Sequence, residues 1–214
     1  MPKTLRSFAL FLVPLLVLTL ACSTLGRQDD DSSVLFSDDF SDPSSGWNSY
    51  QGEEGVTDYD SGQYRIFVNQ SRHDYWAYPG RSFTNVRVEV DATKAGGPDD
   101  NDFGVICRYQ DTENFYAFLI SSDGFYSIMK YSGGNSETLG ADAMLATDVV
   151  NQGSATNHIR ADCVGDSLSL YANGDRLHAV TDSTFSSGDV GLIAGTFDEA
   201  GADIVFDDFV VRQP

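Results

Sequence analysis

The segment that decides the fold is "FGVICRYQDTENFYAFLISSDGFYSIMKY", Phe103–Tyr131. It contains three apolar and aromatic runs, Phe103–Gln110, Asn114–Ser121 and Phe125–Tyr131, which the short turns "DTE" and "SDG" separate. Runs of this length and composition favour strands. Asp123-Gly124 supplies a residue pair that suits a tight hairpin turn. The segment therefore predicts three consecutive antiparallel strands.

The same signal extends on both sides of this segment. "NVRVEVDA" alternates valines with charged residues, which is the period of a half-buried strand. Further strands are expected in "SVLFSDDF", "GQYRIFV", "DYWAYP", "NHIRADCVGDSLSLYANGDRLHAVT", "DVGLIAGTF" and "ADIVFDDFVVRQ". About a dozen strands and no amphipathic helix predict an all-β, antiparallel two-sheet sandwich or barrel.

The order of these segments resembles the concanavalin A-like, or laminin G-like, jelly roll. In particular it is similar to the version in bacterial lipoproteins and in the 3-keto-disaccharide hydrolase domain, also called domain of unknown function 1080. The opening "FSDDFSDPSSGW" and the closing "FDDFVV" carry the resemblance, which covers about residues 36–211. It implies a jelly-roll sandwich whose first and last strands lie side by side. This fold hosts lectins, glycosidases and adhesion modules, so it leaves the function open.

The N-terminus has the pattern of an export signal. Lys3 and Arg6 precede an uncharged run over residues 7–20, which is shorter than the roughly 20 residues of a spanning helix. "LTLAC" then resembles the bacterial lipobox, in which the cysteine, here Cys22, becomes lipidated. We predict a lipoprotein signal peptide over 1–21, a lipidated N-terminus and polar tether over 22–33, and a sandwich domain over 34–214. The alternative is an ordinary cleaved signal with a chance cysteine.

The charge balance restricts the partners. The chain has 13 Lys and Arg against 32 Asp and Glu, a net charge of −19. Such a surface repels phosphate backbones, so we expect no nucleic-acid partner. It also repels anionic lipid headgroups, so charge would not hold the protein on a membrane. We expect an exported monomer that a palmitate-type lipid anchor holds on the bacterial cell membrane.

Two cysteines remain after Cys22. Cys107 and Cys163 form an even pair in a chain with an export signal, which favours a disulfide bond. Each lies among apolar neighbours, so two buried free thiols are the alternative.

A catalytic pair of carboxylates is incomplete in the sequence. Laminarinase-like members of this fold carry two Glu residues and an intervening Asp on one strand. Here "VEVDATKA" supplies Glu89 and Asp91 but no second Glu. These two residues also fit the solvent face of an alternating strand, and His73, His158 and His178 are scattered. We therefore expect no catalysis, with a glycoside-acting enzyme as the alternative.

A ligand platform is expected on one face of the three central strands. If the strands pair in order, this face combines aromatic rings with two cations. Its candidate ligand-binding residues are Arg108, Tyr116, Phe118, Tyr126 and Lys130, with Trp76 from a neighbouring polar-aromatic segment. The opposite face, with Phe115 and Met129, is expected to be plain core. The alternative is that the platform rings pack beneath loops.

Calcium is a further candidate ligand. If the first and last strands pair, Asp39 lies near Asp207 and Asp208, and these carboxylates could share a structural Ca²⁺. "GGPDDNDFG" is a second acidic loop, with Asp99, Asp100 and Asp102. The alternative is a set of exposed turn aspartates.

Together these patterns predict a membrane-anchored, extracytoplasmic lipoprotein whose sandwich binds a ligand, expected to be a glycan or cell-envelope polysaccharide. A protein–protein adhesion or sensor module is a further alternative.

Overall fold

The computed structural model describes Met1 and residues 33–214. The chain divides into two units, Met1–Asp30 and Asp31–Pro214, and the strands of the structure belong to the second. The predicted signal peptide over 1–21, the lipidation site Cys22 and all of the 22–33 tether except Ser33 lie outside the described residues. In the part of the chain that is described, no helix is long and apolar enough to cross a membrane.

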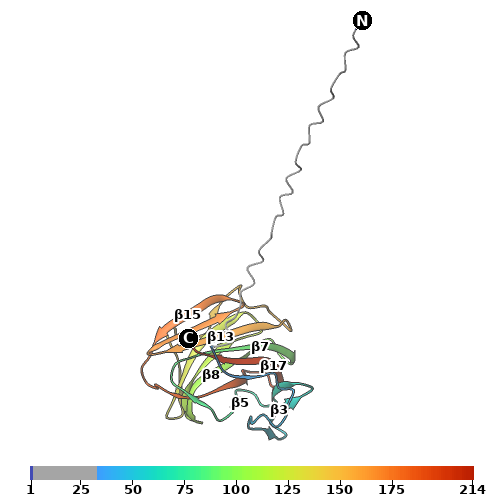
Figure 1. Ribbon diagram of the computed structural model, residues 1–214. Helices are drawn as coiled ribbons and strands as arrows, with labels where there is room; N and C mark the ends of the chain where they lie inside the picture. The colour runs from blue at the N-terminus through green and yellow to red at the C-terminus, as the bar shows by residue number, and fades with distance from the viewer. Residues whose placement is uncertain (2–32) are drawn as a thin grey trace. The chain divides into compact units, whose positions relative to one another are not determined.

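Two antiparallel sheets make up the domain (Figure 1). The nine-stranded sheet contains, in spatial order, β15 (Asp175–Thr181), β14 (Ser167–Ala172), β13 (Asn157–Val164), β7 (Val86–Gly96), β17 (Ala202–Arg212), β4 (Gln63–Val68), β3 (Gly55–Asp60) and β2 (Tyr50–Gln51), with β1 (Val34–Asp38) also paired to β17. The eight-stranded sheet contains β11 (Asn135–Thr138), β10 (Phe125–Ser132), β9 (Asn114–Ile120), β8 (Asn101–Asp111), β16 (Gly188–Thr196) and β5 (Asp74–Ala77), with β12 (Leu145–Ala146) on β10 and β6 (Ser82–Phe83) on β16.

The predicted all-β, two-sheet architecture is confirmed. The three central runs form β8, β9 and β10, which pair in order, and β1 pairs with β17 as expected of first and last strands. The 17 strands exceed the predicted dozen partly because β2, β6 and β12 are two-residue strands, too short to leave a pattern in the sequence.

The main core lies between the sheets, and we call the faces that line it the inner faces. Strand β7 shows why the chain folds this way: its valines are buried, and the charged residues that alternate with them, Arg87, Glu89 and Asp91, are only half-buried. Each sheet thereby contributes one apolar face, and burial of these faces is the main favourable contribution to folding. The predicted Cys107–Cys163 disulfide is present and joins β8 to β13, that is, one sheet to the other.

A bulge interrupts the alternation of β8. Ile106 pairs with Gly191 and Tyr109 pairs with Asp189, so Cys107 and Arg108 together lie opposite the single residue Val190. Arg108 has a φ of 56°, a left-handed conformation that is uncommon outside glycine and that a bulge accommodates. In a regular strand Arg108 and Ile106 would lie on the same face. Because of the bulge they lie on different faces.

Candidate functional site

The predicted ligand platform lies on the inner face. Tyr116 and Phe118 are fully buried in the core, and Arg108 is 2% exposed. Tyr126 and Lys130 are half-buried at the edge of the same face. Because β9 pairs Phe118 with Val105 and Tyr116 with Cys107, these rings face the other sheet. The prediction that they form an exposed platform is therefore wrong.

Arg108 holds loops together. Its guanidinium donates to the carbonyl oxygens of Phe185 (2.6 Å) and Gly165 (2.5 Å), and it lies 3.5 Å from that of Thr84. Burial lowers the pKa of this guanidinium. Its charge is compensated by backbone carbonyls, and the side chain is shielded from solvent, so its role in the structure is to position three connections.

Tyr116 and Lys130 hold the β15–β16 connection, which also contains Phe185, through Asp182. The Tyr116 hydroxyl lies 2.5 Å from one carboxylate oxygen of Asp182, and the Lys130 ammonium lies 2.8 Å from the other. Lys130 also forms an ion pair with Glu137 at 2.7 Å. Both side chains thus have partners within the protein.

The opposite face of the same three strands carries a second cluster, which we call the outer aromatic cluster. It covers the outer face of the eight-stranded sheet. Its buried members are Ile106, Tyr109, Phe115, Ala117, Leu119 and Ile193, and its half-buried members are Trp76, Tyr78, Met129, Tyr131 and Met144. Of the predicted ligand-binding residues, Trp76 belongs to this cluster. Phe115 is fully buried, as expected for a core residue, but in this outer cluster and not between the sheets, and Met129 is half-buried.

The rings of this cluster stack on one another. Tyr131 lies nearly parallel to Phe115 with 4.3 Å between ring centroids, and Tyr78 stacks on Tyr109 at 4.6 Å. Trp76 packs against the other side of the cluster, 5.5 Å from Phe115. The half-buried rings are held in fixed positions while part of each remains available to a ligand.

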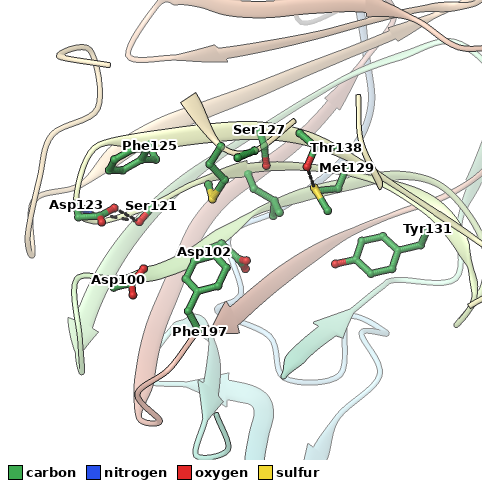
Figure 2. Close-up of a pocket in the computed structure, with 13 residues that line it drawn as sticks. Asp100, Asp102, Ser121, Asp123, Phe125, Ser127, Met129, Tyr131, Thr138 and Phe197 are labelled. Atoms are coloured by element: carbon green, nitrogen blue, oxygen red, sulfur yellow. Dashed lines mark hydrogen bonds between the residues drawn. The ribbon is translucent and has the colours of Figure 1, made fainter. Parts of the chain in front are cut away.

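A cavity of about 460 Å³ opens beside this cluster (Figure 2). Its lining residues are Asp100, Asp102, Leu119, Ser121, Asp123, Phe125, Ser127, Met129, Tyr131, Thr138, Ala143, Met144 and Phe197. Phe125 is 37% exposed, which is unusual for a phenylalanine and makes its ring accessible from the cavity. An apolar lining with a few convergent polar groups is typical of a small-molecule site.

Asp102, which lines the cavity, lies close to a second carboxyl group, that of Asp74. Asp74 on β5 and Asp102 on β8 are both paired with Gly195 on β16, the strand between them. The Tyr131 hydroxyl donates to Asp74 at 2.8 Å, and in Figure 2 this hydroxyl points toward Asp102. The sheet order thus brings together three residues that are far apart in the sequence.

The electrostatics of the cavity are anionic. Burial, and after it the negative charges of Asp74 and Asp100, raise the pKa of Asp102 well above its usual value. Burial also raises the pKa of Asp74, although the Tyr131 hydroxyl and His73 act in the opposite direction. The pKa of Asp100 is raised by partial burial and by surrounding carboxylates, Asp123 first.

Of the three aspartates of the predicted calcium site, two line the same hollow and the third does not. Asp39 and Asp208 line one hollow near the β1–β17 pair, together with Arg81. Asp207 lies 3.4 Å from the Gln63 amide, and the Asp39 carboxylate accepts a 2.7 Å bond from Ser41. Within residues 33–214, no group of three or more His, Cys, Asp or Glu side chains is arranged to hold a metal ion. The calcium site stays a prediction.

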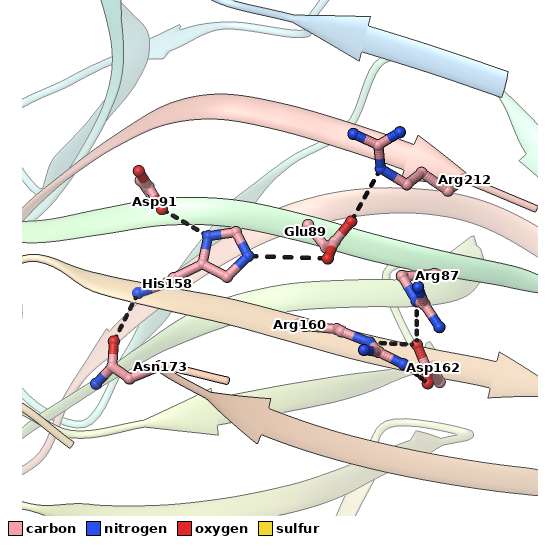
Figure 3. Close-up of polar contacts among 8 residues, drawn as sticks. All are labelled: Arg87, Glu89, Asp91, His158, Arg160, Asp162, Asn173 and Arg212. Atoms are coloured by element: carbon pink, nitrogen blue, oxygen red, sulfur yellow. Dashed lines mark hydrogen bonds and ion pairs between the residues drawn. The ribbon is translucent and has the colours of Figure 1, made fainter. Parts of the chain in front are cut away.

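The candidate carboxylates of the enzyme alternative lie on the other sheet. Glu89 and Asp91 project from the outer face of the nine-stranded sheet and flank His158 (Figure 3). His158 lies 2.7 Å from Asp91, and Arg212 donates to Glu89 at 3.1 Å. His73 packs on Tyr75 and His178 contacts the Leu139 carbonyl. The contacts of Glu89, Asp91, His158 and Arg212 form a network of paired charges on the nine-stranded sheet, whereas the cavity lies on the eight-stranded sheet.

Sequence reasoning missed Asp74 and Gly195. A glycine inside a strand often marks a place where another group approaches closely, and "GLIAGTF" carries one at 195. That signal pointed to a crowded position, but the identity of its neighbours depends on the strand order.

The comparisons with known proteins concern the fold. A scan against protein-family models gave no match, and neither did a search of curated proteins. Among solved structures, carbohydrate binding module CBM66 from Bacillus subtilis is 19% identical with a TM-score of 0.63, over 78% of this chain and 96% of that one. A protein with a galectin-like fold from Bacillus subtilis is 15% identical with a TM-score of 0.60, over 85% and 96%.

A GH16 protein of a Bacteroides ovatus mixed linkage glucan PUL, solved in complex with G4G4G3G product, is also similar. Its identity is 10% and its TM-score 0.57, over 83% of this chain and 100% of that one. The domain thus has the fold of an antiparallel, two-sheet jelly-roll sandwich. The resemblance to the 3-keto-disaccharide hydrolase domain stays a prediction.

Proposed function

We propose that the domain binds a neutral saccharide along the outer face of its eight-stranded sheet, without catalysis. The observation that carries this proposal is the cavity of about 460 Å³, in which exposed aromatic edges lie next to a buried carboxylate. Sugars combine apolar C–H faces, which stack on rings, with hydroxyls, which donate to carboxylates. The cavity offers both kinds of partner.

The charge of the cavity selects among saccharides. Asp100, Asp102 and Asp123 line it, and no Lys or Arg of the described chain does. An anionic sugar would meet like charges at short distance in a partly buried site, which is unfavourable. The ligand is therefore a neutral saccharide. Two similar structures, a carbohydrate binding module and a GH16 protein in complex with a glycan product, support the same class of ligand.

The remaining parts of the proposal come from the sequence. Export and lipid anchoring at Cys22 rest on "LTLAC" after an apolar run, and the Cys107–Cys163 disulfide supports an oxidising compartment. We propose that the domain is displayed as a monomer on the outer side of the bacterial cell membrane. Labelling with a palmitate analogue should mark the protein, and Cys22→Ser should remove the label; equal labelling of both would contradict the anchor.

The binding proposal is tested on a glycan array followed by calorimetric titration with the tightest neutral ligand. Trp76→Ala and Phe125→Ala should each weaken binding about two- to tenfold, the loss of one ring contact. The matched control is Tyr171→Ala, which removes a ring that packs on Arg160 on the nine-stranded sheet. Equal effects of all three changes would contradict the placement of the site.

The absence of catalysis has its own test. The same oligosaccharides should release no new reducing ends on prolonged incubation with the protein. Release that disappears in Asp102→Asn would show that the cavity is an active site.

A further inference from the structure

Three strands of the eight-stranded sheet meet at Gly195. Because Asp74 and Asp102 are its direct neighbours on either side, their side chains project from the same outer face and reach over it. A Cβ on residue 195 would lie 2.5 Å from the Asp102 Oδ1 and nearer still to the Asp74 Oδ1. No side chain fits there unless a carboxyl group moves, so the glycine lets the two carboxyl groups lie over residue 195.

One oxygen of this pair lacks a partner. Asp102 is 8% exposed, and its Oδ1 has no hydrogen-bond partner among residues 33–214. A buried acceptor without a donor is unfavourable, and native structures rarely tolerate one unless a ligand or water uses it. Because Asp102 also lines the cavity, a ligand hydroxyl that enters the cavity can supply the missing donor.

We propose that Asp74 and Asp102 form a carboxyl-pair subsite that holds two neighbouring hydroxyls of a neutral sugar, with Gly195 giving the two carboxyl groups room to come together. One hydroxyl donates to the Asp102 Oδ1 and its neighbour to the Asp74 Oδ1. The Tyr131 hydroxyl, bonded to the other oxygen of Asp74 at 2.8 Å, fixes the orientation of that carboxyl. This inference rests on the proposed function and names the residues that determine its specificity.

The groups around the pair favour a neutral ligand. Tyr131 faces it from β10, His73 precedes Asp74 on β5, and Asp100 and Asp123 carry negative charge at the cavity wall. Burial raises the pKa of both Asp74 and Asp102, so the pair keeps a proton at pH values where ordinary aspartates have lost theirs. A pair with one proton both donates and accepts, as sugar hydroxyls do, whereas a sugar carboxylate would be repelled.

The test uses three variants and two matched controls. Asp102→Asn and Asp74→Asn keep the side-chain volume, and Gly195→Ala forces a carboxyl group of the pair to move. Asp175→Asn removes a charge at an exposed position of β15, on the other sheet and outside the cavity. Gly96→Ala places a methyl group in a strand where its nearest neighbour, the Asp203 Cβ, lies 3.7 Å away.

The probes are neutral gluco-, xylo- and fructo-oligosaccharides, with oligogalacturonides as the acidic comparison, titrated into the full chain by calorimetry. Asp102→Asn, Asp74→Asn and Gly195→Ala should each raise the Kd for the best neutral probe at least about tenfold. Both controls should stay within about twofold, and oligogalacturonides should not bind. Melting curves establish that each variant is folded, and the two Asn variants decide the outcome if Gly195→Ala does not fold.

Failure of this inference differs from failure of the proposed function. Loss of binding in Trp76→Ala with unchanged Kd in both Asn variants would overturn the subsite and leave the saccharide site in place. Tight binding of oligogalacturonides would also overturn the subsite. If the wild-type chain bound none of the neutral probes, the subsite and the proposed function would both be wrong.

Discussion

Arg108 is a residue whose sequence context suggests a ligand contact and whose surroundings indicate a structural role. It lies in the β8 bulge and donates to a carbonyl group in the β13–β14 turn and to another in the segment that precedes β16. Replacement would leave the buried Phe185 carbonyl and the part-buried Gly165 carbonyl without this donor. Replacing a core arginine therefore lowers the stability of the fold, whereas replacing an arginine in a binding site lowers the affinity for the ligand.

We predict that Arg108→Leu lowers the free energy of unfolding by about 2–4 kcal/mol, because one buried and one part-buried carbonyl lose their charged donor. Saccharide affinity of the folded protein should stay unchanged. Urea denaturation and titration at a temperature well below the transition measure the two quantities. If the variant were as stable as the wild type but no longer bound the saccharide, Arg108 would be a ligand-binding residue and the structural role would be wrong.

Asp102 should make the stability of the protein depend on pH in an unusual direction. Its pKa is raised by folding, so the folded state binds more protons than the unfolded chain above about pH 4. Stability therefore falls as the pH rises from about 4 through the raised pKa. Asp102→Asn should reduce this fall and should stabilise the protein at neutral pH.

Denaturation midpoints at a series of pH values from about 4 to 8 measure this effect. Asp175→Asn, a change at an exposed position at the start of β15, is the control and should leave the profile unchanged. Identical slopes for the wild type and Asp102→Asn would show that Asp102 ionises normally.

At the scale of elements, the paired strands β7 and β13 carry a charged network on their outer face. The neighbouring carboxylates of Glu89, at 3.8 Å, and Asp91, at 2.7 Å, outweigh the effect of burial and raise the pKa of His158 to about 9. Because the folded pKa lies above the unfolded value of about 6.5, the stabilisation is complete below that value. It is lost as the pH rises toward about 9 and beyond.

We predict that the wild type loses stability between about pH 7 and 9.5 and that His158→Gln loses less over this range. The imidazole is 48% exposed, so solvent screening limits the contribution to under about 1 kcal/mol. Thermal denaturation at each pH measures it. A larger loss in the variant than in the wild type would contradict the assignment.

The strands themselves were predictable, but their faces were not. β7 alternates valine with charge, so its inner face can be read from the sequence. By contrast, β9 is buried on both faces after its first residue, and its alternation does not distinguish the core from the outer aromatic cluster. The Cys107–Arg108 bulge then shifts the pattern of β8 by one residue, and strict alternation cannot anticipate that shift.

The carboxyl pair shows the other limit of sequence reasoning. Asp74, Asp102 and Gly195 meet only because β16 lies between β8 and β5 in the sheet. Local patterns specify each strand but not this long-range order. The disulfide was predictable because two cysteines in a chain with an export signal have few alternatives, whereas a site made from three distant strands has many.

At the scale of the whole domain, the two outer faces differ in character. The nine-stranded sheet presents charges that are paired with one another, among them Glu89 with His158 and Arg87 with Asp162 (Figure 3). The eight-stranded sheet presents aromatic rings and a cavity, and there a carboxylate oxygen has no partner in the described chain (Figure 2). This second face offers interactions that the domain itself leaves unused, so we expect the ligand there.

Hydrogen-exchange mass spectrometry of the full chain, with and without a saturating neutral oligosaccharide, tests this claim most directly. Protection should appear in peptides that cover the cavity wall at 121–125, 139–146 and 197–201, and peptides from β13 to β15 should be unchanged. Protection confined to β13–β15, or to the Asp39 and Asp208 hollow, would contradict the account.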